Sequence, residues 1–480
     1  MAAHFANGIP PRLLMWQRVR EYAVPPSMIE TATARRAAGD WAGACAAARV
    51  DVDLDLCAVR HRHGTDVLAR LRADLRRLAP DLLRWHLPRT APDGRLRPDL
   101  TILLARYGSS SFPLDLVVRT PPPWADAGQR VSLALWEGPS GAAVRPALRQ
   151  HPSRYRYGHP YPYPYPHPHP DRRFRLDLHR HLWDATRSGE LARRSGADRP
   201  YDPDSPWAVP TWADEAELLL RAAGRPRGPF TVRLGARRRA VLELFGPDDS
   251  HAPQFRVVTV ELAAHEIAAL PVLPEAAARV LPDLELLRAE LVPAGALHPL
   301  VGAALAPYVP HPAVAGDAPP VASPGDPHRV ECRGEVHRIA LRDGVLTAVD
   351  HDPGEVRREE LLVALGGPAL PCLRAIDAAH RDPEALPAVR ERLGHGDVAG
   401  ALAVVEGLLG PGAVLRDGPL RAELARAAAR RVDHGLFRAG LVAGHPGAEG
   451  DRRLRLDRTA PPLLRSKRMR RDRPRIGQFG

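Results

Sequence analysis

The chain has 480 residues, enough for two to four domains of roughly 100–200 residues each. Its hydrophobic fraction of 44% and charged fraction of 26% are those of a globular protein, and no apolar run approaches the roughly 18 residues of a transmembrane helix. Only one of the 68 basic residues is a lysine, Lys467, which excludes a Walker A motif, a protein-kinase strand lysine and a Ser-x-x-Lys pair.

The N-terminal third of the chain is expected to be mainly helical. Residues 1–26 carry no secretory apolar segment and are expected to be a ragged extension, so the sequence predicts a cytoplasmic protein. Residues 27–87 have helical apolar spacing, and Asp40 and Asp55 are placed to cap helices.

From about residue 100 the apolar period changes to two, which predicts β-strands. Strands are expected near 114–118, 131–135 and 174–178, and again between 230 and 262. We expect them to form one central sheet, mixed or antiparallel, over about 100–262. A proline-, tyrosine- and histidine-rich loop of low complexity at 150–170 interrupts it, because proline at alternate positions removes ladder donors.

The C-terminal part begins with a hairpin signal. Apolar alternation at 336–341 and 345–349 flanks Asp343-Gly344, a strong turn pair, and helical patterns follow from 357 to 434. The predicted class is therefore α+β, with a helical N-terminal segment, a central sheet, a C-terminal hairpin plus helical bundle and a disordered basic tail. The expected divisions are an extension (1–26), an α+β domain (27–308), a linker (309–327), a hairpin–helix domain (328–440) and a tail (441–480).

Two short segments far apart in the chain resemble one another. Residues 39–44 and 396–401 are identical at five of six positions, with the pattern Gly-Asp-x-Ala-Gly-Ala. In each, the glycine ends one helix and the aspartate begins the next, as in a helical hairpin of the tetratricopeptide kind. Two copies 357 residues apart are not a repeat array, and in a chain rich in alanine and glycine a chance similarity is the favoured interpretation.

The four cysteines, Cys45, Cys57, Cys332 and Cys372, are scattered without a C-x-x-C pair. This distribution predicts small buried hydrophobic side chains and indicates neither a disulfide framework nor a Cys-rich zinc site.

One cluster of metal-ligand types follows the strand expected at 174–178. It comprises Asp177, His179, His181 and Asp184. Imidazole and carboxylate groups are usual ligands of zinc, iron or manganese, and His179 and His181 would share a face if the strand continued. A surface histidine pair is the competing interpretation, since the chain has 21 histidines.

The positive charge is concentrated at the C-terminal end. Residues 451–480 hold eleven basic and three acidic residues, which is +8 of the net charge of +12. Such a tail can bind nucleic acid without sequence preference, or an acidic protein surface. The residues expected to do so are Arg465, Lys467, Arg468, Arg470, Arg471, Arg473 and Arg475.

The sequence thus predicts a non-catalytic interaction or adaptor protein, with an unknown protein partner, nucleic acid as a further partner of its tail, and no membrane partner. It requires no cofactor. The alternative is a metal-dependent hydrolase or nuclease centred on His179 and His181, and its cofactor would be a divalent metal ion.

Overall fold

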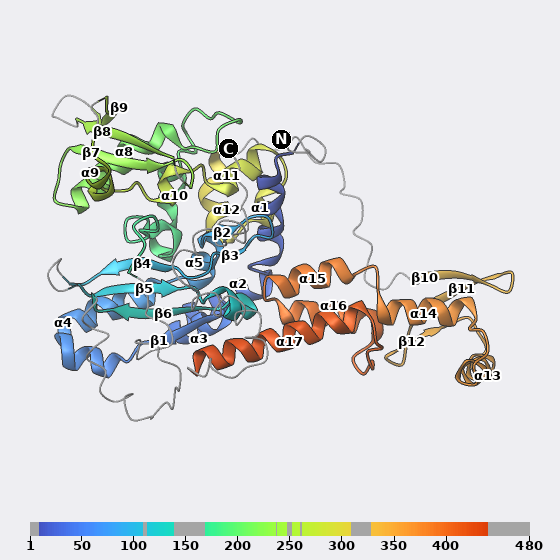
Figure 1. The fold of residues 1–480 in the computed structure, drawn as a ribbon. Helices are drawn as coiled ribbons and strands as arrows, with labels where there is room; N and C mark the ends of the chain where they lie inside the picture. The colour runs from blue at the N-terminus through green and yellow to red at the C-terminus, as the bar shows by residue number, and fades with distance from the viewer. Residues whose placement is uncertain are drawn as a thin grey trace, which may run out of the picture. The chain divides into compact units, whose positions relative to one another are not determined.

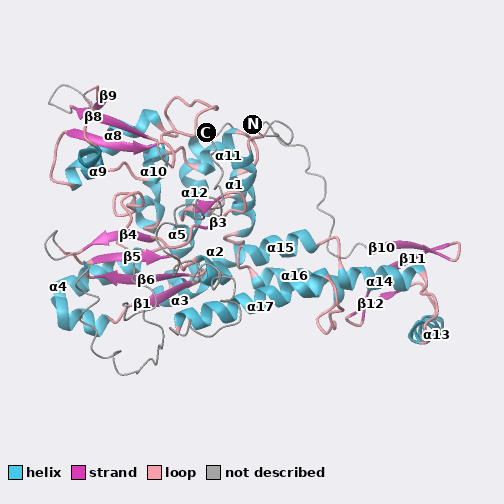
Figure 2. Cartoon of the chain, viewed as in Figure 1, coloured by secondary structure: helices cyan, strands magenta, loops and turns pink. Residues whose placement is uncertain are grey.

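The computed structural model describes residues 9–108, 113–138, 169–236, 238–246, 252–259, 262–308 and 328–439. They belong to two compact units (Figure 1). We call the described residues within 9–126, 130–308 and 436–439 the first unit, and those within 127–129 and 328–435 the second unit. Helices and strands occur in both, so the chain has the α+β fold class predicted from its sequence (Figure 2). Among the described residues, no helix has the length and apolar character needed to span a bilayer.

The central element of the first unit is a four-stranded sheet. Its order is β1 (Val50–Asp53), β6 (Val131–Trp136), β5 (Asp115–Arg119) and β4 (Thr101–Arg106). The sheet is mixed, because β1 runs parallel to β6 while the other pairs are antiparallel. Every residue of β4 and β5 except the last of each strand is buried, so both faces of the sheet are covered.

The strands that follow form a separate sheet, so the prediction of one sheet between about 100 and 262 is wrong. β7 (Gly228–Arg233), β8 (Arg239–Phe245) and β9 (Gln254–Val257) pair antiparallel with one another and with no strand of the four-stranded sheet. They share a core of their own with α8 (Trp212–Ala222). The strand expected at 174–178 is reduced to one isolated bridge, between Leu103 and Arg175, followed by turns. Apolar alternation predicts that a segment is a strand. It does not predict which other strand the segment pairs with, because that pairing depends on contacts distant in sequence.

The N-terminal segment is built into the first unit. α1 (Pro11–Tyr22) buries Val19 in the main hydrophobic core, so the expectation of a ragged extension over 1–26 is wrong for the described part. The buried Arg20 donates to the carboxylate of Asp283 at 2.7 Å and to the carbonyl of Trp85 at 2.8 Å. The indole of Trp85 donates to the same carboxylate at 3.0 Å. These contacts tie α1 to segments far along the chain.

Two further helices of the first unit, α3 (Trp41–Ala47) and α4 (Leu56–Arg77), begin at the predicted caps. The carboxylate of Asp40 accepts from the Gly43 amide at 2.7 Å, and that of Asp55 accepts from the Ala58 amide at 2.9 Å. The first unit also contains a two-stranded hairpin, β2 (Arg89–Thr90) with β3 (Arg95–Leu96). The remaining described α-helices of the first unit are α2 (Pro26–Ala37), α5 (Pro80–His86), α7 (Leu191–Ser195), α9 (Ala264–Ala269), α10 (Glu275–Ala278), α11 (Pro282–Arg288) and α12 (Pro299–Leu305).

The second unit combines a three-stranded antiparallel sheet with helices. The sheet has the order β10 (His328–Cys332), β11 (Glu335–Arg342) and β12 (Val345–Ala348), and the predicted turn at Asp343-Gly344 joins the last two strands. Both turn residues have positive φ, 53° and 77°, which is the conformation that Asp-Gly favours. The helices are α13 (Pro353–Ala364), α14 (Pro371–Arg381), α15 (Leu386–Gly394), α16 (Val398–Leu409) and most of α17 (Pro419–Arg438).

The two similar segments adopt the same local structure in the two units. Gly39 and Gly396 have φ of 78° and 83°, and the aspartate after each caps the next helix through the amide three residues further on. An arginine five residues before each aspartate donates to its carboxylate, at 3.2 Å from Arg35 and 3.1 Å from Arg392. The short pattern therefore has the same helix–turn–helix geometry in two different surroundings.

Three expected segments lie outside the described residues. These are the linker at 309–327, nearly all of the low-complexity loop at 150–170 and the basic tail at 441–480. Their predictions therefore stay predictions.

Candidate functional site

The histidines of the predicted metal set lie in the interior of the first unit. His179 caps the 3-10 helix η5 (Arg180–Leu182), so the strand on which both histidines would share a face is not formed. The two rings are only 2% and 4% exposed and meet edge to face, with their centroids 5.7 Å apart. Nδ1 of His179 lies 3.2 Å from Arg194, which donates to the Glu215 carboxylate at 2.7 Å.

The charges around these histidines disfavour a cation. Burial, together with the nearby charge of Arg194, lowers the pKa of His179 to about 3. Burial also lowers the pKa of His181 well below its ordinary value, and His179 and Arg194 contribute to that shift. The rings are therefore neutral at physiological pH. A neutral imidazole can bind a metal, but a divalent cation here would face the same guanidinium that depresses these pKa values.

The carboxylates of the predicted set are engaged elsewhere. Asp177 accepts from Arg175 at 2.6 Å. Asp184 caps the 3-10 helix η6 (Ala185–Glu190), accepting from the Thr186 amide at 3.0 Å and from its hydroxyl at 2.7 Å. The metal site at these four residues remains a prediction, and their contacts do not favour it. The predicted binding residues Arg465–Arg475 lie in the tail, outside the described residues.

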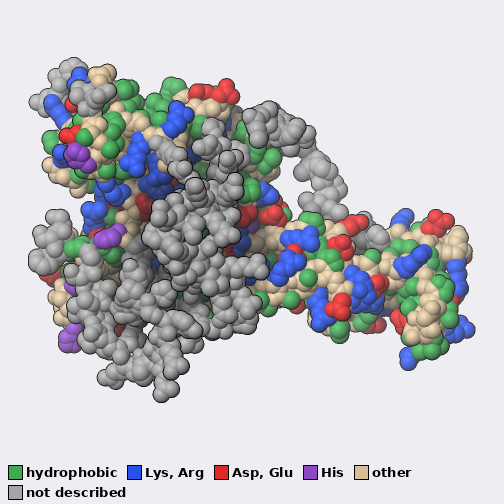
Figure 3. Space-filling view, in the orientation of Figure 1, with side chains coloured by type: hydrophobic (Ala, Val, Ile, Leu, Met, Phe, Trp, Pro, Cys, Tyr) green, Lys and Arg blue, Asp and Glu red, His purple; other side chains and the backbone are tan. Residues whose placement is uncertain are grey.

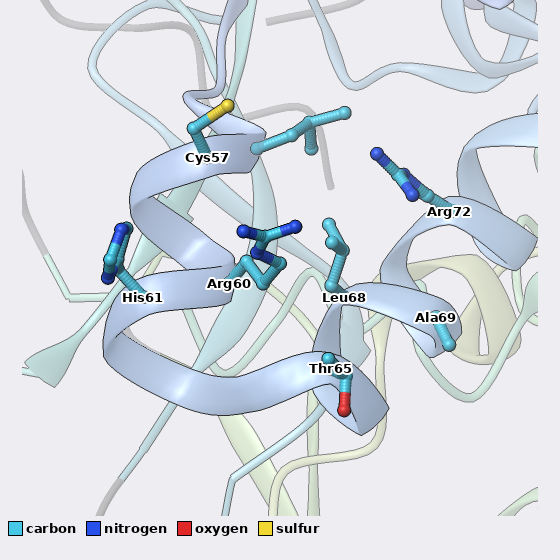
Figure 4. Close-up of a pocket in the computed structure, with 8 residues that line it drawn as sticks. Cys57, Arg60, His61, Thr65, Leu68, Ala69 and Arg72 are labelled. Atoms are coloured by element: carbon cyan, nitrogen blue, oxygen red, sulfur yellow. The ribbon is translucent and has the colours of Figure 1, made fainter.

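A surface pocket opens along α4 in the first unit (Figure 4). Its volume is about 420 Å³, and residues from both sides of Gly64, where the helix is interrupted, line it. Arg60, His61 and Arg72 contribute the basic groups, and none of the eight lining residues is acidic. The pocket suits an anion better than a cation, although its arginines are exposed and no buried polar group points into it.

The cysteines differ from the sequence expectation. Cys45, Cys332 and Cys372 are buried as predicted, whereas Cys57 is exposed at the start of α4. Cys332 and Cys372 also lie together, with His351, in the second unit. One ligand atom from each of these three residues lies within 4.8 Å of the other two, and this is the only such group of histidine, cysteine or acidic side chains among the described residues.

Three separate segments position this cluster, which we call the Cys₂His cluster. Cys332 is the last residue of β10, His351 lies between β12 and α13, and Cys372 is the second residue of α14. The two sulfurs belong to a small buried apolar group with Ala348. Burial, followed by the neighbouring Cys332 thiol, raises the pKa of Cys372 to about 11, so Cys372 is a thiol at physiological pH.

The imidazole of His351 lies beside one carboxylate and one other imidazole. Its Nδ1 lies 4.0 Å from the Glu355 carboxylate, and its Nε2 is buried without a hydrogen-bond partner. Arg333, adjacent in sequence to Cys332, donates to Glu355. The ring of His337 stacks on that of His351, with centroids 3.8 Å apart, and Nδ1 of His337 is also buried without a partner.

Sequence reasoning missed the Cys₂His cluster because its members are 19 and 21 residues apart and match no short motif. The structure shows why the cysteines meet: β10 and the N-terminus of α14 each place one cysteine beside the hairpin of β11 and β12.

Comparison with known proteins adds no assignment, since no family model, curated protein or solved structure matches the chain.

Proposed function

We propose that this chain is a non-catalytic interaction protein that associates through the apolar end of α13. The observation that carries the proposal is a run of apolar residues at the surface of the second unit. Leu361, Leu362, Val363 and Leu365 are 60%, 45%, 37% and 86% exposed, and α13 has no buried residue. Consecutive exposed apolar side chains are unfavourable in water unless another surface covers them.

The chemistry of this surface favours a protein partner over a nucleic acid. No charge interrupts residues 361–365, and the charges that precede them on α13 have both signs, as in Arg358 and Glu359. Figure 3 shows hydrophobic side chains at this end of the second unit, with basic and acidic ones beside them. Phosphates require a concentration of positive charge, which is absent from this surface.

The partner we assign to the α13 surface is a second copy of the same chain. An uncharged apolar segment is complementary to itself, and a two-fold dimer places the same segment of both copies at the interface. Each exposed leucine is then covered by an equivalent side chain, and no unpaired charge becomes buried.

The experiment compares the oligomeric state of the full chain with that of two variants, by size-exclusion chromatography with light scattering over a range of concentrations. The variant Leu361→Glu/Leu365→Glu should be monomeric at concentrations where the unmodified protein is dimeric. Val414→Glu is the matched control, because Val414 is 84% exposed in the same unit but is not on α13. A monomeric unmodified protein, or a double variant that still dimerises, would contradict the proposal.

The basic tail supplies the second interaction predicted from the sequence. Residues 451–480 should hold any affinity for nucleic acid, because +8 of the net charge of +12 lies there. The logarithm of the affinity should fall with the logarithm of salt concentration, by about 0.9 per phosphate neutralised on duplex DNA. Fluorescence anisotropy with labelled DNA should show binding that truncation after Gly450 removes. Equal binding by the truncated chain would place the affinity elsewhere.

A further inference from the structure

We propose that Cys332, His351 and Cys372 bind a Zn²⁺ ion that holds the second unit together. Two thiolates and an imidazole are a ligand set that zinc prefers, and zinc sites of this kind are usually tetrahedral. The three ligand atoms already lie within 4.8 Å of one another, which is compatible with attachment to one ion. The site is separate from the α13 surface proposed for association, and neither proposal depends on the other.

The unpartnered nitrogen of His351 identifies the ligand atom. Its Nδ1 faces Glu355, which leaves Nε2 as the buried nitrogen that needs a partner. The Glu355 carboxylate is 4.0 Å from Nδ1, which is too long for a hydrogen bond, so it places a negative charge beside the ring without fixing its orientation. Glu355 is itself paired with Arg333.

A disulfide between Cys332 and Cys372 would explain less of the structure. It would use both sulfurs, but it would leave Nε2 of His351 buried without a partner. A zinc ion satisfies all three groups together. Binding converts both thiols to thiolates, releases two protons to solvent and leaves the histidine neutral, so the two negative charges balance the ion.

The described residues supply three ligands, which leaves the fourth position of a tetrahedral ion open to water. The ring of His337 stacks on that of His351, so the nitrogens of the two rings do not converge on one ion, and His337 is not among the residues whose ligand atoms lie within 4.8 Å of one another. The ion would join the end of β10, the segment before α13 and the start of α14.

The surroundings explain why this part of the chain would need a metal ion. Residues 328–435 contain no phenylalanine, tyrosine or tryptophan, and the apolar group around the two cysteines includes only three buried residues. A limited apolar core leaves more of a domain's stability to other interactions, and a structural metal ion is one of these. A zinc ion bound at the junction of three segments would supply stability that the side chains alone do not.

The test is elemental analysis of the full chain, expressed with zinc and purified without a histidine tag. We expect stoichiometric zinc in the unmodified protein and its loss in Cys332→Ser/Cys372→Ser. Cys57→Ser is the matched control, because Cys57 is exposed in the first unit, and it should retain the ion. The variant His179→Ala/His181→Ala should also retain it, which separates this site from the enzymatic alternative.

A second measurement protects the test against misfolding of the cysteine variant. The unmodified chain is stripped with a chelator under reducing conditions and then titrated with Co²⁺, whose visible spectrum reports tetrahedral thiolate coordination. We expect a stoichiometric spectrum that Zn²⁺ abolishes. Failure of the reduced chain to bind either ion, or full zinc content in Cys332→Ser/Cys372→Ser, would overturn the proposal.

Discussion

In the first unit the side chains of Arg20 and Asp283 form an ion pair that is almost completely buried, whereas in the second unit a run of leucine and valine side chains at the end of α13 lies in water. The same contrast holds more widely. Ten of the fifteen large apolar side chains that are exposed among the described residues belong to the second unit, which is much the smaller of the two. All eight tryptophans of the chain belong to the first.

This difference indicates that the two units are stabilised in different ways. The first unit has enough apolar and aromatic volume to surround charged groups and satisfy them internally. The second has a core of leucine, valine and alanine around α15 and α16, and it leaves apolar surface for another molecule. Its proposed zinc ion and its proposed dimer contact would both compensate for that small core.

The largest expected effect is that of acid, which should lower the stability of the first unit. Burial lowers the pKa of His86 to about 4 and that of His179 to about 3, and it lowers that of His181 well below the ordinary value near 6.5. The unfolded chain takes up protons at these three sites below pH 6.5, whereas the folded unit does not. The stability present above pH 6.5 is therefore lost as the pH falls towards 4. At pH 5 the loss should be about 1–2 kcal/mol per histidine.

Urea unfolding followed by tryptophan fluorescence measures this effect, because all the tryptophans report on the first unit. The control is Leu182, which directly follows His181 but has no charge to titrate. Leu182→Ala should lower the stability at every pH without changing its pH dependence. A first unit whose stability is the same at pH 7.5 and pH 5 would contradict the assignment of neutral buried histidines.

Removal of one buried charge should have the next largest effect. Asp283→Ala would leave the Arg20 guanidinium buried without its carboxylate and the Trp85 indole without an acceptor. Loss of one member of a buried pair typically costs about 3–5 kcal/mol. Asp214→Ala breaks an ion pair with Arg199 in which both side chains are nearly half exposed, and it should change stability by less than about 1 kcal/mol. Equal effects in urea unfolding would show that the buried pair has no special role.

The shared helical hairpin gives a smaller and more selective test. Asp40→Ala should destabilise the first unit and Asp397→Ala the second, each by about 1 kcal/mol, because each removes one N-cap. Tryptophan fluorescence should detect only the first change, whereas far-ultraviolet circular dichroism should detect both. Substitution by asparagine, which can also cap, should restore most of the loss. A fluorescence change in Asp397→Ala would mean that the units do not unfold independently.

Local signals predicted much of the fold, and features that depend on distant contacts were missed. Asp40, Asp55 and Asp397 cap helices as expected, and Asp343-Gly344 forms the expected turn, because each interaction spans only a few residues. The division of the strands into two sheets could not be read from alternation. The packing of residues 11–22 could not be predicted either, because Arg20 pairs with the carboxylate of Asp283, 263 residues further along the chain.

The candidate sites show the same dependence on distance in sequence. His179 and His181 formed a candidate site because they are close in sequence. The turn of η5, however, places both side chains in the interior, with an arginine nearby. Cys332, His351 and Cys372 carried no such local signal, and only the arrangement of β10 and α14 brings them together.

The pairing of β1 with β6 has a consequence for the order in which the chain acquires its structure. Val50 lies beside Val131 in that parallel pair, so a long stretch of chain must be closed before the four-stranded sheet can form. In the second unit, β11 and β12 are joined by a tight turn, and α15 and α16 are adjacent in sequence. Contacts close in sequence form faster than distant ones. The second unit, although most of it follows the first unit along the chain, should therefore reach its native topology sooner in a refolding experiment.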